Sequence, residues 1–204
     1  MAQARHNSPA TTEPSDARTR ILDAAADQLR RHGPAKTGVV DVARAVGISH
    51  AAVYRHFASK DALFDAVAER WLETVSSPLK AIAERRGSAV KRLEAWLTEL
   101  FAIKRRKVTN DRELFETYHA IAEAARAVVS AHVAELHRQA ATIVADGIAS
   151  KEFRVKNAND AAAAVLDATA RFHHPHLVLE SPSNPAAERR VVRLVLAGLS
   201  AGDL

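Results

Sequence analysis

The feature that most constrains this chain is the stretch over residues 36–60, KTGVVDVARAVGISHAAVYRHFASK, which predicts two short helices joined by a tight turn. In its first half, apolar residues recur at i, i+3, i+4 and i+7, the spacing of one buried helix face: Val39, Val42, Ala43 and Val46. Gly47 follows, and glycine readily adopts the positive φ with which a chain leaves a helix sharply. Ser49 is a good N-cap for the second helix. The stretch therefore predicts a helix-turn-helix.

The second helix of this motif has an unusual outer face. Val53 and Phe57 are expected to point inward, and the opposite face then gathers small, aromatic and basic residues. That face and the residues that follow it comprise His50, Ala51, Tyr54, Arg55, His56 and Lys60. Small residues let a helix approach another surface closely, and Tyr, Arg and Lys side chains are typical phosphate contacts. An ordinary helical hairpin would not explain this gathering, whereas a helix that enters the DNA major groove does.

The distribution of charge favours the same reading. Residues 16–60 carry eight Lys or Arg and four Asp, a net charge of +4. Residues 61–204 carry twenty Lys or Arg and nineteen Asp or Glu, a net charge of +1. Nearly all of the excess positive charge thus lies in and before the helix-turn-helix, which is the electrostatic footprint of a nucleic-acid-binding face.

The motifs over residues 37–63 resemble the TetR family of bacterial transcriptional regulators. The elements that carry the resemblance are Val42-Ala43, Gly47-Ile48-Ser49, Tyr54-Arg55-His56-Phe57 and Ser59-Lys60-Asp61-x-Leu63. The preceding run ILDAAADQLRRHG looks like the first helix of that family. The resemblance implies an all-α fold, with a three-helix DNA-binding head and a helical body for ligand binding and dimerisation. It implies that a small molecule releases a repressor from its operator.

The DNA-contacting residues expected from the motif and the resemblance are Thr37, Gly38, Val39, Ser49, His50, Ala51, Tyr54, Arg55, His56 and Lys60. Gly38 stands where the family usually has Thr, so a hydroxyl that often touches phosphate is lost, and Thr37 could supply one instead. His50 and Ala51 are expected to face bases, because imidazole can donate to a purine and a methyl group can touch thymine. Backbone N–H groups behind Ser59, together with the Lys60 ammonium, predict a phosphate clamp.

The expected domain boundaries follow composition and helix breaks. Residues 1–14 are polar with two prolines and predict a disordered arm. The head is expected over residues 15–62, its last helix is expected to connect as far as about residue 77, and the body is expected over 78–204. Helical periodicity in the body predicts helices near 79–86, 88–106, 110–118, 119–147, 157–174 and 186–200.

The last two helices are the predicted dimer surface. The first of them is rich in small residues, and the second is apolar on more than one face, which requires a second partner. The residues expected there are Ala164, Leu166, Ala168, Val192, Val195 and Leu199. The alternative is that the same residues fill the core of a monomer, whereas the resemblance implies a homodimer that reads a palindromic operator in double-stranded DNA.

The larger aromatic residues of the body are candidates for lining a ligand cavity, and simple core packing is the alternative for each. They are Trp71, Trp96, Phe101, Phe115, Tyr118 and Phe172, with His119 nearby. The scarcity of paired charges favours a small apolar ligand. His173, His174 and His176 invite a metal hypothesis. Neighbouring histidines diverge on a helix and no regular acidic ligand accompanies them, so no metal or cofactor is expected.

Other functional classes find little support in the sequence. The chain has no cysteine, which excludes a disulfide framework, and no glycine-rich, Ser-His-Asp or paired-carboxylate arrangement indicates an enzyme. No apolar run approaches the ~18 residues of a membrane span, and the polar N-terminus predicts a cytoplasmic protein. The remaining alternative is a helical small-molecule-binding or interaction protein whose helix-turn-helix no longer reads DNA.

Overall fold

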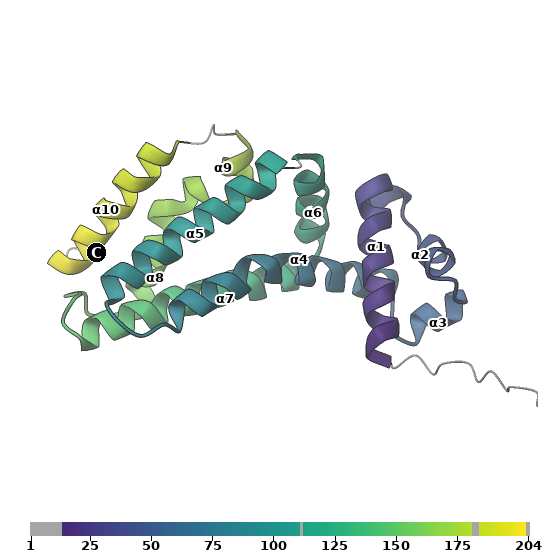
Figure 1. Ribbon diagram of the computed structural model, residues 1–204, viewed down its shortest axis with the longest axis horizontal. Coiled ribbons are helices and arrows are strands. Elements are labelled where there is room, and N and C mark those ends of the chain that lie inside the picture. Colours follow the sequence, from purple (N-terminus) through teal and green to yellow (C-terminus); the bar gives the residue numbers. More distant parts are fainter. Residues whose placement is uncertain (1–13, 111, 181–183, 203–204) are drawn as a thin grey trace, which may run out of the picture. The chain divides into compact units, whose positions relative to one another are not determined.

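A computed structural model describes residues 14–110, 112–180 and 184–202, and every regular element in these ranges is helical, as expected (Figure 1). The chain divides into two compact units, Met1–Val67 and Ala68–Leu204, and each is described by itself below. The arm expected over residues 1–14 lies outside the described residues except for Pro14, where the first helix begins.

The first unit, called the head, contains α1 (Pro14–Lys36), α2 (Val39–Val46), α3 (His50–Tyr54) and the start of α4 (Lys60–Ala83). Its core is built from Ile21, Leu22, Ala25 and Leu29 of α1, Val39, Val42 and Ala43 of α2, and Val53, Phe57 and Leu63, and it includes residues of the apolar faces predicted for the helix-turn-helix. The helical conformation of α1 is interrupted at Gly33, where φ is 72°. This positive φ favours glycine and breaks the helix directly before Pro34.

The turn between α2 and α3 has the predicted chemistry. Gly47 adopts φ 74° and ψ 33°, the left-handed conformation that favours glycine. The next N–H group, that of Ile48, donates to the carbonyl of Ala43 at 3.0 Å and closes the end of α2. The Ser49 hydroxyl then caps α3, because its Oγ accepts from the N–H of Ala52 at 3.1 Å. Local residues thus fix the angle between the two helices.

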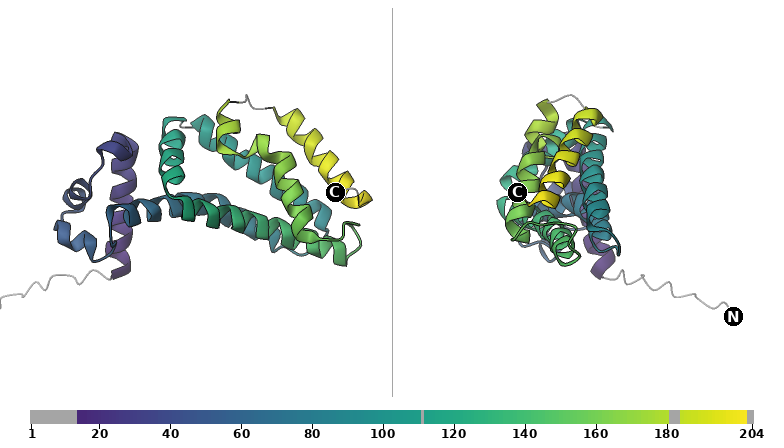
Figure 2. Two further views of the ribbon diagram at one scale, coloured as in Figure 1. Left: turned by 180° about the vertical axis from the view of Figure 1, so that it is seen from behind. Right: turned by 90° about the vertical axis from the view of Figure 1, so that its left-hand side faces the viewer.

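The second unit, called the body, is an array of helices that pack around one core. They are the rest of α4, α5 (Ala89–Asn110), α6 (Arg112–Ala124), α7 (Arg126–Ala149), α8 (Ala158–Thr169), a 3₁₀ turn (Ala170–Phe172), α9 (Pro175–Glu180) and α10 (Pro185–Ala201). Both α7 and α10 pack against α5 and α8, and Figures 1 and 2 show α5 and α8 lying between α7 and α10. This core carries Trp96, Leu97, Leu100 and Ile143 at its centre.

Three predicted boundaries in the body are wrong. The fourth helix was expected to end near Pro78, but α4 continues to Ala83, because Val75, Leu79 and Ile82 on either side of the proline are all buried in the core. That packing outweighs the ~3 kcal/mol cost of an interior proline. The break expected after residue 118 lies instead at Ala125, whose φ of −85° and ψ of 55° interrupt the helix without glycine or proline. The loop expected after Pro175 contains α9.

Half of the predicted dimer residues are committed to the core of the chain itself. Val192, Val195 and Leu199 are at most 4% exposed and belong to the body core. They were assigned to an interface because the last helix is apolar on more than one face, and a single buried face was expected to satisfy the core. Among the described residues of α10, the large apolar side chain that is left in solvent is that of Leu194, which is 73% exposed. Of the three residues on α8, Leu166 packs partly against the core, Ala164 is half-buried and Ala168 is exposed.

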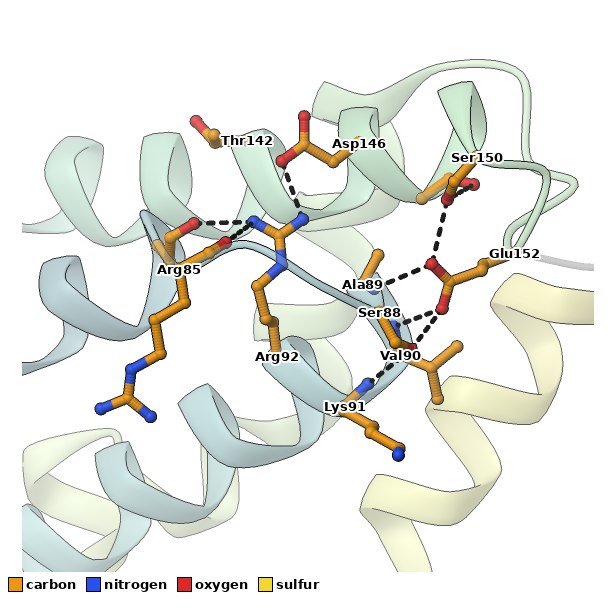
Figure 3. A network of polar contacts seen from close by, with 12 residues as sticks. Arg85, Ser88, Ala89, Val90, Lys91, Arg92, Thr142, Asp146, Ser150 and Glu152 are labelled. Carbon is orange, nitrogen blue, oxygen red and sulfur yellow. Dashed lines mark hydrogen bonds and ion pairs between the residues drawn. The ribbon is translucent and has the colours of Figure 1, made fainter.

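A polar network fixes one end of the body (Figure 3). Arg92 of α5 donates from Nη1 to the carbonyls of Ala83 and Arg85, at 3.0 and 2.9 Å, and from Nη2 to Asp146 Oδ2 of α7 at 2.8 Å. These two carbonyls lie at the C-terminal end of α4 and just after it, where backbone acceptors have no partner within the helix. Arg92 therefore caps α4 and ties it to α5 and α7.

The start of α5 is capped from a distant part of the chain in the same network. The Glu152 carboxylate accepts from the N–H groups of Ala89 and Val90, at 3.0 and 3.3 Å, and from the hydroxyls of Ser88 and Ser150. These hydrogen bonds lower the pKa of Glu152 to about 2. A carboxylate at a helix N-terminus is also favoured by the helix dipole. The loop after α7 is thereby fastened to α5.

Candidate functional site

The head presents one exposed face on α3. Ala52 and Val53 anchor this helix by their burial, and His50, Ala51, Tyr54 and Arg55 are left in solvent. The rings of His50 and Tyr54 meet edge to face with their centroids 4.8 Å apart. The structure thus brings together two residues expected to touch DNA and holds both at the surface.

Two residues expected to contact DNA are not available for side-chain contacts. Thr37 is 1% exposed and its hydroxyl donates to the carbonyl of Gly33 at 2.8 Å, so it cannot replace the hydroxyl that is missing at position 38. Val39 is 6% exposed and packs in the head core. Gly38 serves as the N-cap of α2, where its N–H donates to Asp41 Oδ2 at 3.0 Å. The sequence analysis assigned Val39 both to the buried face of its helix and to the DNA-contacting set, and its burial supports the first assignment.

The remaining basic residues that were expected to contact DNA come directly after α3 in the chain. Arg55 is exposed and His56 is half-buried, directly after the helix. Lys60 begins α4, behind Ser59, whose Oγ accepts from the N–H of Ala62 at 3.0 Å. The Lys60 ammonium lies 5.0 Å from the centroid of the Phe64 ring, which holds the flexible side chain near the start of the helix.

The body contains a cavity of about 570 Å³ between helices α4 to α8 and the segment that follows α8. This volume lies within the roughly 300–1,000 Å³ that is usual for small-molecule sites. Most of its wall is apolar, with Trp71, Leu72, Val129, Val133, Leu136 and Leu166 among its lining residues. The walls also carry several titratable groups, and these give the cavity its chemistry.

The most unusual of these groups is Lys104 of α5. It is 4% exposed and lines the cavity, and the described part of the chain offers its ammonium no hydrogen bond or ion pair. Burial lowers its pKa to about 8, with a smaller contribution from the charge of Lys107. Lys104 therefore remains mostly protonated at pH 7 while it is held in a poorly solvated position.

Two histidines of the cavity wall are neutral at pH 7. Burial lowers the pKa of His132 to about 4, and its Nε2 atom is buried without a partner among the described residues. Burial lowers the pKa of His173 to about 4 as well, and its Nε2 lies 3.1 Å from the carbonyl oxygen of Leu166. The charge of Lys104 contributes to both shifts, so the three groups share one electrostatic environment.

The aromatic residues predicted for a ligand site are distributed over several places. Trp71 and His119 line this cavity, whereas Trp71, Phe115 and Tyr118 line a neighbouring hollow and Phe101 lines a third. Trp96 is fully buried, and its Nε1 donates to Gln139 Oε1 at 3.0 Å, so it is a core residue. Phe172 packs on Phe101, with ring centroids 5.2 Å apart.

The rim of the cavity holds a cluster of His119, Glu123 and His176, whose nearest ligating atoms all lie within 4.8 Å of one another. The Nε2 atoms of the two histidines are 3.2 Å apart, and His176 Nε2 lies 3.0 Å from Glu123 Oε1. Two histidines and a carboxylate are a ligand set that zinc accepts. The histidines singled out in the sequence do not converge on one point, since half-buried His173 meets the carbonyl of Leu166 and His176 joins His119 instead.

Sequence reasoning missed Lys104 and His132, although the helical period marks both. Lys104 follows Leu93, Leu97 and Leu100 on the buried face of α5 at the same spacing. His132 lies one turn before the buried Leu136 of α7. Their positions in the helical period predict burial, while their residue types predict exposure. Such a conflict between position and residue type is common at functional sites.

The fold and these sites define an all-helical protein with a helix-turn-helix head and a body that contains a cavity. The family model described as "Bacterial regulatory proteins, tetR family" matches residues 21–67, and that described as "Tetracyclin repressor-like, C-terminal domain" matches residues 89–195. The chain belongs to the TetR family.

Individual relatives are more distant. Nucleoid occlusion factor SlmA of Aliivibrio fischeri strain MJ11 is 36% identical over 98 residues, which cover 48% of this chain and 50% of that protein. The chain thus matches about half the length of such curated relatives. Among solved structures, FadR from Bacillus subtilis in complex with stearoyl-CoA has a TM-score of 0.65 at 14% identity, covering 88% of this chain and 98% of that one. A TetR/AcrR regulator from Thermobifida fusca YX-ER1 has a TM-score of 0.62 at 22% identity, covering 90% and 98%. At these identities, the structures show a common fold.

Within the described ranges, no helix combines the length and the apolar character that crossing a bilayer requires.

Proposed function

We propose that this protein is a DNA-binding transcriptional regulator in the cytoplasm, a repressor that leaves its operator when a small molecule binds the body. The observation that carries the proposal is the face of α3, where buried Ala52 and Val53 present His50, Ala51, Tyr54 and Arg55 to solvent. A helix anchored in this way can enter the major groove with its small residues against the bases. The proposal involves no catalytic reaction.

Within this face, the contacts divide by chemistry. His50 and Ala51 at the start of α3 are proposed to face bases, since an imidazole can donate to purine acceptors and a methyl group can touch thymine. Tyr54, His56 and Lys60 are proposed to contact phosphates, which position the head without reading sequence. Thr37 and Val39 are left out of the contact set because both are buried.

Fluorescence anisotropy with DNA from upstream of the protein's own gene tests the proposal. Lys60→Ala should weaken binding to all sequences similarly and reduce the slope of log affinity against log salt by about one. Lys91→Ala, the same change on an exposed lysine of the body, is the control and should leave both quantities unchanged. Wild-type protein that binds no upstream DNA would favour a helical small-molecule-binding protein that does not read DNA.

We propose a homodimer that reads a palindromic site, because two related recognition helices can then meet two half-sites about one helical turn apart. Exposed Leu194 of α10 replaces buried Val195 as the interface residue to test. Leu194→Glu should dissociate the dimer in light scattering and leave the helical circular dichroism intact. Val195→Glu should unfold the chain, because it buries an unpaired charge in the body core. A Leu194→Glu protein that stays dimeric would remove this face from the interface.

The link between ligand and DNA is proposed to run through α4. Residues 60–67 of this helix belong to the head and residues 68–83 to the body, where Trp71 and Leu72 line the cavity. A ligand that prefers one position of the body segment competes with DNA that prefers another, and the coupling is reciprocal. A coupling of about 1–3 kcal/mol changes operator affinity by roughly 5- to 150-fold. Body ligands that never alter operator affinity would contradict the switch.

A further inference from the structure

The charged groups of the cavity wall lie at different depths: Arg126, Glu123 and Asp167 are exposed, whereas Lys104 is 4% exposed. Lys104 is a buried residue whose ammonium makes no hydrogen bond or ion pair with the described residues, and the Nε2 atom of His132 is buried without a partner among them. The acidic residues of the wall, Glu123 and Asp167, are exposed, and Glu123 is paired with His176. A buried cation without a partner is costly, whereas a buried cation that meets an anion and further hydrogen-bond groups is stabilised.

We propose that the cavity takes a monocarboxylate with an apolar body, whose carboxylate pairs with the Lys104 ammonium and accepts a hydrogen bond from His132 Nε2. This assignment rests on the proposed function and names the class of its ligand. It replaces the apolar ligand expected from the sequence, which would leave both buried groups unsatisfied.

The charge on the buried groups of the cavity, rather than on its exposed residues such as Arg126, selects the kind of acid. Lys104 supplies one buried positive charge, and the two nearby histidines of the wall, His132 and His173, are neutral at pH 7 because burial lowers the pKa of each. One positive charge balances a carboxylate, while a phosphate dianion would keep an excess negative charge in a poorly solvated site. The two oxygens of a carboxylate can also serve two donors, an ammonium and an imidazole N–H.

The apolar part of the wall accounts for the rest of the ligand. Trp71 and Leu72 of α4, Val133 and Leu136 of α7, and Leu166 of α8 line the same space. A cavity of about 570 Å³ has room for an alkyl chain or an aromatic ring system beside the carboxylate. Burial of this apolar surface supplies affinity, and the Lys104 pair supplies the choice of head group.

Isothermal titration calorimetry of the full chain with three probes of equal length tests this assignment. Octanoate should bind the wild-type protein, while octan-1-ol and octylammonium should bind at least about tenfold more weakly, since a hydrogen-bonded charge pair is worth a tenfold factor or more. Lys104→Met, which keeps the length of the side chain, should lose the preference for octanoate over octan-1-ol. Lys107→Met, a change at a lysine of the same helix that does not line this cavity, should keep it.

Thermal unfolding of both variants checks that each is folded, and His132→Phe provides a second substitution that should weaken octanoate binding without abolishing it. Octanoate that binds no more tightly than octan-1-ol, or not at all, would overturn the assignment, as would an unchanged preference in Lys104→Met. The titration contains no DNA, so its failure is separate from that of the proposed function. A protein that binds octanoate but no DNA would contradict the proposed function alone.

Discussion

Helix α5 carries two buried cations in opposite situations. Arg92, near its start, is 8% exposed and donates to two carbonyls and a carboxylate (Figure 3). Lys104, further along, is 4% exposed and has no hydrogen-bond or ion-pair partner among the described residues. Both side chains are on the same helix of the body, so the helix itself does not explain the difference. The difference lies in the groups that surround each cation: protein acceptors surround Arg92, and a cavity adjoins Lys104.

The Arg92 end is complete without any ligand. Arg92 satisfies carbonyls at the end of α4, Glu152 satisfies N–H groups at the start of α5, and only the Nε atom of Arg92 lacks a partner among the described residues. Such a network holds helix ends in place because each removed member strands a buried group. At the Lys104 end, by contrast, the buried polar groups of Lys104 and His132 have no partner among the described residues, so a ligand could supply the missing hydrogen bonds.

The largest effect that tests this comparison is expected from Arg92→Met. The substitution strands the carbonyls of Ala83 and Arg85 and leaves Asp146 without its cation, so it should lower the free energy of unfolding by about 3 kcal/mol. Urea denaturation followed by circular dichroism measures the change. Arg92→Lys keeps the charge but not the forked geometry and should recover only part of the loss. A loss no larger than that of a surface substitution would show that the network is not structural.

Lys104→Met should have the opposite sign. It removes a buried charge that has no partner, and methionine fills much the same space, so the unliganded protein should gain about 1 kcal/mol at pH 7. The same denaturation experiment, with both proteins free of ligand, measures the gain. A destabilised Lys104→Met protein would show that the ammonium has a structural partner, and the contrast with Arg92 would fail.

The gain should also depend on pH. The folded pKa of Lys104 is about 8, below the ordinary value of 10.5, so between these values the unfolded chain binds more protons than the folded one. The wild-type free energy of unfolding should therefore rise with pH across this window, and the advantage of Lys104→Met should shrink. The lowered pKa of Lys107 acts in both proteins and largely cancels in the difference. A difference that stays constant from pH 8 to 10.5 would contradict the assigned burial.

The same comparison shows what a sequence can predict. In the head, the decisive residues act on their neighbours: Gly47 turns the chain and Ser49 caps the helix that follows, so both the fold and the exposed face of α3 could be predicted. In the body, the decisive contacts join distant segments. Arg92 and Asp146 are 54 residues apart, and no local sequence pattern predicts that they pair.

The cavity could not be predicted from the sequence for a related reason. Lys104 lies in the run IKRRK, where composition predicts a solvated charged face, and only its spacing from Leu97 and Leu100 places it inside. The dimer residues of α10 show the converse, since a helix apolar on several sides was assigned a partner where the core of the body takes Val192, Val195 and Leu199. Periodicity predicts which face is buried, but it does not say whether another chain, the chain's own core or a ligand covers that face.

The smallest effect is expected at Glu152, where the network meets water. Its folded pKa of about 2 lies below the ordinary 4.5, because it accepts hydrogen bonds from Ser88 and from the N–H groups that begin α5. The carboxylate therefore stabilises the fold above pH 4.5, and this contribution is lost as the pH falls from 4.5 towards 2. Because water reaches the group, Glu152→Gln should cost only about 1 kcal/mol at pH 7.

Unfolding curves of wild-type and Glu152→Gln proteins at pH 7 and at pH 3 measure this effect, and the difference between the two proteins should be smaller at the lower pH. Glu94→Gln, at an exposed glutamate of α5, the helix that Glu152 caps, is the control and should give a small difference at both pH values. If Glu152→Gln costs as much as Arg92→Met, the two caps act as one unit, and the ordering of effects within the network is wrong. If it costs nothing at either pH, the N–H groups of Ala89 and Val90 are satisfied by water, and Arg92 alone distinguishes the complete end of the body from the cavity.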